Sequence, residues 1–147
     1  MKPSVEALYL DTSCLLKLFL REPESARVAE LLDSEDSVVL SELGILEAET
    51  QLRARLLGGL LTKARYSRLG AELQRTLTLE PFSCVPFPQD GFERARSLAA
   101  RTRVHSRTLD LLHLAAMEAL GVTRLLTNDS AQAAVANALG FQVVSPT

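Results

Sequence analysis

Four acidic residues occupy positions that suggest a functional site: Asp11, Glu47, Asp110 and Asp129. Asp11 directly follows a short apolar run, and Asp129 comes shortly after the apolar run Arg124–Leu126. Four carboxylates in one pocket repel one another unless some take up protons or a divalent cation neutralises them. Because all four offer oxygen ligands, we expect them to bind Mg²⁺, with Mn²⁺ as the alternative.

A divalent ion held in this way can do hydrolytic chemistry on a phosphodiester. It lowers the pKa of a bound water, orients that water for in-line attack and stabilises the leaving oxygen. The hydroxyls of Thr12, Ser13 and Thr127 are expected to surround the ion as supporting groups. The sequence assigns no residue to substrate binding, which stays unknown at this stage.

Asp110 is the acid whose position is hardest to explain structurally. In a helix it shares its face with His113, Leu114 and Met117, so it points along a largely apolar stripe. Burying a lone carboxylate is costly unless it is paired or binds a metal. A first-turn acid gains only about 0.3–1 kcal/mol from the helix dipole, which is too little to offset full burial.

The other three acids also have structural explanations, which the sequence leaves open. Glu47 has apolar neighbours on its predicted helix. It either belongs to this apolar stripe or lies at its edge, with its carboxylate extended into solvent. Asp11 is placed to cap the helix that follows it. Asp129 is placed to cap the next helix along the chain, with Gln132 completing a capping box.

Short apolar runs alternate with stretches of helical period, and these elements must position the acids. Strands are expected at 7–10, 37–40, within 82–87, at 124–127 and at 141–144. Helices are expected at 12–20 with Thr12 or Ser13 as cap, and at 24–32, 41–58, 62–77, 91–102, 109–120 and 131–139. This alternation predicts an α/β fold whose central parallel sheet, of about four to five strands, is covered by helices on both faces. Ligands in such folds bind beyond the carboxyl ends of the strands, where Asp11 and Asp129 fall.

Length and composition indicate one domain over residues 1–147, with 47% hydrophobic and 23% charged residues. No apolar run is long enough to span a membrane, and the first six residues lack the apolar region of a secretion signal. Cys14 and Cys84 are expected to be reduced thiols, so we expect a cytoplasmic protein. The net charge of −2 argues weakly against nucleic acid, but removing the four acids leaves 14 acidic against 16 basic residues. Thirteen of those bases are Arg, which suits phosphate contacts.

Four segments resemble, in order, the motifs of PIN-domain nucleases of the VapC toxin type. They are residues 10–19 with Asp11, 41–47 with Glu47, 109–116 with Asp110, and 126–129 with Asp129 followed by a closing strand within 138–146. The resemblance runs from about Leu8 to Pro146. It implies a PIN-like α/β sandwich and a metal-dependent endoribonuclease, the toxin of a type II toxin–antitoxin pair. It also implies an RNA substrate, a homodimer and a cognate antitoxin protein that blocks the site.

The chain departs from that family pattern at Ser130, where a basic residue often follows the last acid. The last acid is also the most variable of the four in that family, so Asp129 is the least secure of the four expected ligands. His113 matches a frequent family position and is expected to support its helix instead of binding metal. His105 is assigned no function.

Competing functions differ in the residues that they require. A dehalogenase-like phosphatase needs a second Asp where Ser13 stands, and neither a P-loop nor a dinucleotide-binding glycine motif is present. The remaining alternative is a non-catalytic PIN-like module that binds RNA or protein. Helix 62–77, with the arginines at 53, 55, 65, 68 and 75, is either a surface for RNA or a partner, or an ordinary amphipathic helix.

Overall fold

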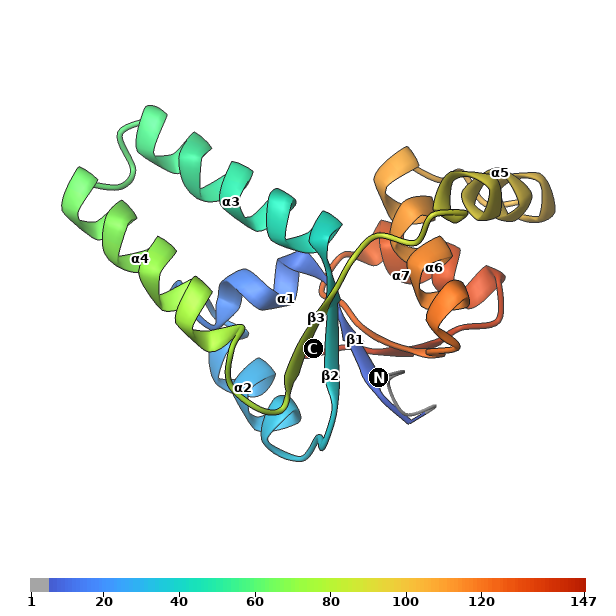
Figure 1. Ribbon diagram of the computed structural model, residues 1–147, viewed down its shortest axis with the longest axis horizontal. Coiled ribbons are helices and arrows are strands. Elements are labelled where there is room, and N and C mark those ends of the chain that lie inside the picture. The colour runs from blue at the N-terminus through green and yellow to red at the C-terminus, as the bar shows by residue number, and fades with distance from the viewer. Residues whose placement is uncertain (1–5) are drawn as a thin grey trace.

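Five short strands form one parallel sheet in the computed structural model, which describes residues 6–147. They are β1 (Leu8–Leu10), β2 (Val38–Ser41), β3 (Phe82–Val85), β4 (Arg124–Leu126) and β5 (Gln142–Val144). Their order across the sheet is β3-β2-β1-β4-β5, and every neighbouring pair is parallel. Figure 1 labels β3, β2 and β1. All five strands match expected segments. The interpretation of residues 1–6 as lacking a secretion signal falls almost wholly outside the described residues.

The alternation of side chains along the strands divides the core into two halves. Tyr9 and Leu125 belong to one buried cluster, whereas Leu8, Leu10 and Leu126 belong to the other. Because successive side chains of a strand point to opposite faces, each cluster covers one face of the sheet. A sheet buried on both faces is typical of parallel α/β folds.

Seven helices cover the two faces. They are α1 (Thr12–Lys17), α2 (Ser25–Asp33), α3 (Glu42–Leu57), α4 (Lys63–Thr76), α5 (Gly91–Arg101), α6 (Thr108–Leu120) and α7 (Ser130–Ala138). The first four pack on the face of Leu8 and Leu10, and the last three pack on the face of Tyr9. Figure 1 shows these two groups on opposite sides of the sheet, with α3 and α4 as a projecting hairpin. The expected α/β fold is confirmed.

The helix after β1 begins at Thr12 as expected, but its cap and its end differ from the prediction. Its N-cap position is Asp11, with extended backbone and without a side-chain capping bond. Thus neither Thr12 nor Ser13 is the cap, and the carboxylate of Asp11 does not cap the helix. The helix ends at Lys17 instead of Leu20. Lys17 is 7% exposed and its ammonium pairs with Glu22 and Glu24. Pro23 disfavours helical backbone at the residue before it, so the chain turns here and folds around the buried ammonium.

The strand order places the site-bearing loops together. The chain runs from β1 to β2 on one side, and β4 pairs with β1 on the other side. The sheet order therefore reverses at β1, and ligands of open α/β sheets bind in the crevice at such a reversal. Asp11 follows β1 there, and Asp129 follows β4.

Among residues 6–147, none of the helices combines the length and the apolar character needed to cross a membrane.

Candidate active site

Asp11 lies at the carboxyl end of the central strand, 8% exposed, and hydroxyl groups fix its carboxylate. Ser13 Oγ and Thr127 Oγ1 donate hydrogen bonds to Asp11 Oδ2 over 2.9 and 2.7 Å. The Thr127 bond ties the end of β4 to the end of β1. Within residues 6–147 we find no hydrogen bond to the second oxygen, Oδ1, so this oxygen remains open to a ligand.

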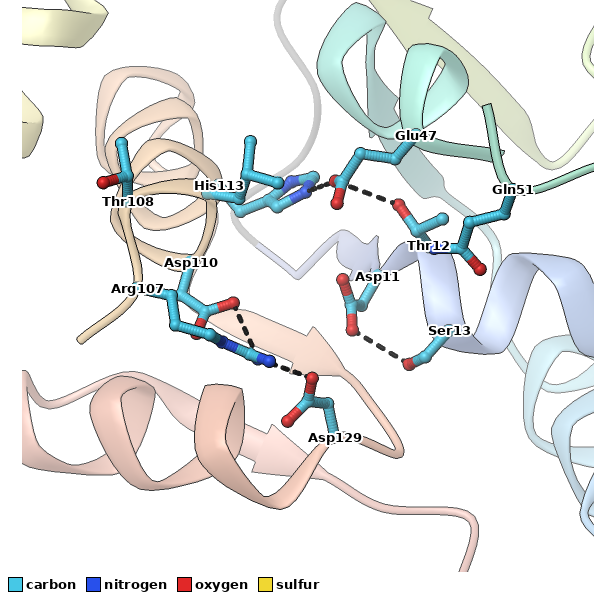
Figure 2. A pocket seen from close by; sticks show the side chains of 11 residues that line it. Asp11, Thr12, Ser13, Glu47, Gln51, Arg107, Thr108, Asp110, His113 and Asp129 are labelled. Carbon is cyan, nitrogen blue, oxygen red and sulfur yellow. Dashed lines mark hydrogen bonds and ion pairs between the residues drawn. The ribbon is translucent and has the colours of Figure 1, made fainter. Parts of the chain in front are cut away.

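Glu47 reaches the same region from the second turn of α3 (Figure 2). Its Oε1 accepts a hydrogen bond from Thr12 Oγ1 at 3.2 Å and contacts Nε2 of His113. The side chain is 21% exposed, and Leu46 beside it is 63% exposed. Glu47 therefore lies at the edge of the apolar stripe, and its carboxylate turns inward to α1 and α6.

A chain of buried hydrogen bonds holds His113 in place behind Glu47. Tyr9 hydroxyl lies 2.7 Å from His113 Nδ1 and 2.8 Å from Ser41 Oγ. Burial raises the pKa of Tyr9 well above its usual value, so the phenol keeps its proton. Because a carboxylate only accepts, His113 Nε2 is the donor to Glu47, and His113 Nδ1 shares a hydrogen bond with the Tyr9 hydroxyl. The expected role of His113 as support for its own helix is thus too narrow, since the ring links β1, α3 and α6.

Asp110 is the third residue of α6, and it is 7% exposed. It is paired, which the sequence argument did not foresee. Arg107 donates from Nε to Asp110 Oδ2 at 2.7 Å and from Nη2 to Asp110 Oδ1 at 3.1 Å. The guanidinium thus supplies the compensating charge that a buried carboxylate requires in the absence of a metal ion.

Asp129 has two roles, one for each carboxylate oxygen. Its Oδ1 caps α7 by accepting from the N–H groups of Ala131 and Gln132, and its Oδ2 accepts from Arg107 Nη2 at 2.6 Å. Partial burial raises the pKa of Asp129, but the bonds from Arg107 and from the backbone outweigh it and leave the pKa below its usual value. The capping box is wrong: the amide group of Gln132 is buried without a partner within residues 6–147. The N–H of Asp129 binds Thr127 Oγ1 instead.

One open pocket of about 320 Å³ brings the four acids together with Thr12 and Ser13. The acids come from the ends of β1 and β4 and from α3 and α6, and Figure 2 shows them facing a common space. Within the described part of the chain, no three His, Cys, Asp or Glu side chains are placed to hold a metal ion as they stand. The Arg107 guanidinium lies between Asp110 and Asp129, so those carboxylates hold a cation of the protein's own.

Several side chains of the site were not predicted from the sequence, among them Arg107, Gln51 and Tyr9. Arg107 precedes Asp110 by three residues, and this spacing on a helix indicates an ion pair. Gln51, one turn after Glu47, also lines the pocket, and its i, i+4 spacing was a usable signal. Tyr9 was interpreted only as part of a buried strand, because no local pattern reveals a partner 104 residues away.

The arginines of the α3–α4 hairpin lie away from this pocket. Leu69 and Leu73 bury one side of α4, as expected of an amphipathic helix. Arg55, Arg65 and Arg68 line a separate groove together with Glu22 and Glu72, so acidic groups partly balance the charge there.

Comparison with known proteins gives both a family and a close full-length relative. The family model described as PIN domain matches residues 8–138. Ribonuclease VapC46 of Mycobacterium tuberculosis is 33% identical over 143 residues, which cover 96% of this chain and 98% of VapC46. The resemblance seen in the four motifs is thereby confirmed.

Solved structures show the same fold at lower identity. VapC20 of M. tuberculosis, described as a sarcin–ricin loop cleaving toxin, is 18% identical and superposes with a TM-score of 0.70 over 91% of this chain and 95% of its own. A toxin–antitoxin complex from Klebsiella pneumoniae gives 20% identity and a TM-score of 0.65 over 97% of this chain and 98% of its own.

Proposed function

We propose that this chain, which belongs to the PIN-domain family, is a metal-dependent endoribonuclease and the toxin of a type II toxin–antitoxin pair. The observation that carries the proposal is the pocket at which four carboxylates from four separate elements meet. The full-length similarity to a protein named as a ribonuclease supports the choice of RNA as substrate. We assign the whole chain, residues 1–147, to one nuclease domain.

The donor set fits a divalent cation of the Mg²⁺ or Mn²⁺ kind. The four acids offer only carboxylate oxygens to the pocket, and such hard ligands suit these ions. Two oxygens are open already, Asp11 Oδ1 and Glu47 Oε2, since the hydrogen bonds found within residues 6–147 use the other oxygen of each carboxylate. We therefore propose Asp11, Glu47, Asp110 and Asp129 as the metal ligands. When bound, the ion would supply Lewis acidity, which activates water and stabilises a leaving oxygen.

The residues of the chain would orient these groups before RNA arrives. Ser13 and Thr127 hold one oxygen of Asp11 and so direct the other toward the pocket. Thr12 and His113 do the same for Glu47. Preorganised ligands avoid reorganisation during the reaction, which is a main source of catalysis in such sites. Thr12, Ser13 and Thr127 thus act as supporting residues.

The expected binding partners of the chain follow from its proposed role as a toxin. We propose that two copies of the chain form a homodimer in the cytoplasm and that a cognate antitoxin protein blocks the carboxylate pocket. The similarity in fold to a toxin–antitoxin complex supports the antitoxin.

The metal requirement can be tested directly with purified protein and total RNA. We expect cleavage with Mg²⁺ or Mn²⁺, loss of cleavage in excess EDTA, and recovery when the metal is added back. Asp110→Asn, purified in parallel, controls for contaminating ribonuclease and should be inactive under every condition. Cleavage that persists in EDTA, or in Asp110→Asn, would contradict the proposal. Metal and RNA binding without turnover would favour the alternative, a non-catalytic PIN-like binding module.

A further inference from the structure

The guanidinium of Arg107 holds two of the four acids of the pocket, and these two come from different elements. It binds both oxygens of Asp110 at the start of α6 and the free oxygen of Asp129 at the start of α7. Figure 2 shows the side chain lying between the two carboxylates. A single positive group thus occupies the space that a metal ion would need in order to reach the same oxygens.

The side chain of Arg107 lies at the solvent edge of the pocket. It is the N-cap residue of α6 and is 52% exposed, whereas the side chain of Asp110 is 10% exposed. A cation at a helix N-terminus is disfavoured by the helix dipole. The carboxylates, and not the helix, therefore hold the guanidinium in the pocket.

We propose that Arg107 is an internal counterion that competes with the metal for Asp110 and Asp129 and is displaced when the metal binds. The inference rests on the proposed metal site. Whatever stabilises the metal-free form weakens metal binding, because the pairs must break before the ion can take their oxygens. The guanidinium also repels a cation bound nearby, so both effects have the same sign. Arg107 is a positioning residue of the site, since it acts through the two carboxylates.

The size of the effect follows from the kind of pair that is broken. Half-exposed ion pairs contribute modestly, and a guanidinium that holds two carboxylates stands at the upper end of that range. We expect Arg107→Gln to bind Mn²⁺ about threefold to tenfold more tightly than the wild type. Arg107→Lys keeps the charge but loses the fork that binds both oxygens of Asp110, so it should fall between the two.

The experiment is a titration of metal-free protein with Mn²⁺, in which electron paramagnetic resonance counts the free ion. Arg103→Gln is the matched control, because it removes an exposed arginine from the same loop, for which we find no ion pair within residues 6–147. Its Mn²⁺ affinity should equal that of the wild type. Circular dichroism and urea unfolding establish that each variant is folded.

Each outcome decides the matter. Tighter binding in Arg107→Gln alone supports the competition, as does Mn²⁺ binding that is detected only in this variant. Equal or weaker binding in Arg107→Gln, with clear binding by the wild type, overturns the inference and leaves the metal site standing. An equal gain in Mn²⁺ affinity in Arg103→Gln also overturns it, because the gain then comes from the loss of any positive charge in this loop. No binding by wild type or variant contradicts the metal site itself, and the inference falls with it.

Discussion

Tyr9→Phe removes one buried hydroxyl from the hydrogen-bond chain behind Glu47. The ring of Tyr9 is fully buried, so the smaller side chain keeps the apolar packing and loses only the polar contacts. Ser41 Oγ and His113 Nδ1 both bind this hydroxyl, and both residues are at most 2% exposed. Water therefore has no ready access to the groups that the substitution leaves without a partner.

The expected loss follows from those two orphaned groups. Each buried polar group left unsatisfied costs about 1–3 kcal/mol, so the two orphaned groups of Tyr9→Phe should lower the free energy of unfolding by about 2–6 kcal/mol. Because typical domains are stable by only about 5–15 kcal/mol, this loss is a large fraction of the total stability and is easily measured in a denaturation experiment.

Urea unfolding in EDTA, followed by circular dichroism, measures the effect without any contribution from metal. Tyr66→Phe is the matched control, because Tyr66 is the only other tyrosine of the chain and we find no hydrogen bond to its hydroxyl within residues 6–147. It should change stability by less than about 0.5 kcal/mol. Adding Ser41→Ala to Tyr9→Phe should recover part of the loss, with a coupling of at least about 0.5 kcal/mol. A loss for Tyr9→Phe no larger than that for Tyr66→Phe would refute the hydrogen-bond chain.

Three further predictions concern the core, a helix end and the thiols. Leu114→Ala opens a cavity at a fully buried position of α6 and should cost about 2–5 kcal/mol in urea unfolding; a cost below 1 kcal/mol would contradict the packing. Gly121→Ala places a side chain at a φ of 72° after α6 and should cost about 1–2 kcal/mol by the same method, whereas an unchanged midpoint would argue against the left-handed turn. Burial raises the pKa of Cys14 to about 12 and keeps reagents away from its thiol, whereas Cys84 is exposed, although partial burial and the charge of Glu42 also raise its pKa. A thiol reagent at pH 8 should therefore label Cys84 alone in the native protein and both residues in urea, and rapid native labelling of Cys14 would refute its burial.

The fold could be predicted from the sequence because its strands are short apolar runs separated by helical periods. All five expected strands and seven helices are present, and most of their ends shift by one or two residues. The larger error, at the end of α1, depends on the ion pairs of Lys17. The hydrophobic pattern of the sequence does not indicate that the Lys17 ammonium is buried and paired with Glu22 and Glu24, which lie outside the helix.

The site could be predicted only as far as each residue's position in its own element allows. Asp11 and Asp129 follow parallel strands, so their convergence could be expected from topology alone. The burial of Asp110 was also predicted correctly, but its partner Arg107, three residues earlier, was not identified from the sequence. The contact of Tyr9 with His113 joins elements far apart in sequence, and only the assembled fold reveals it. The role of the four acids as metal ligands stays a prediction.

The most direct test of the central claim compares RNA cleavage rates of acid-to-amide variants in Mg²⁺. Asp11→Asn and Asp110→Asn alter the buried acids of the pocket, and Glu49→Gln alters an exposed acid on the same helix as Glu47. Loss of several kcal/mol of charge stabilisation slows a reaction about 100-fold or more. We predict that loss for both pocket variants, folded as judged by circular dichroism, and a wild-type rate for Glu49→Gln. Cleavage at the wild-type rate by either pocket variant would contradict the account.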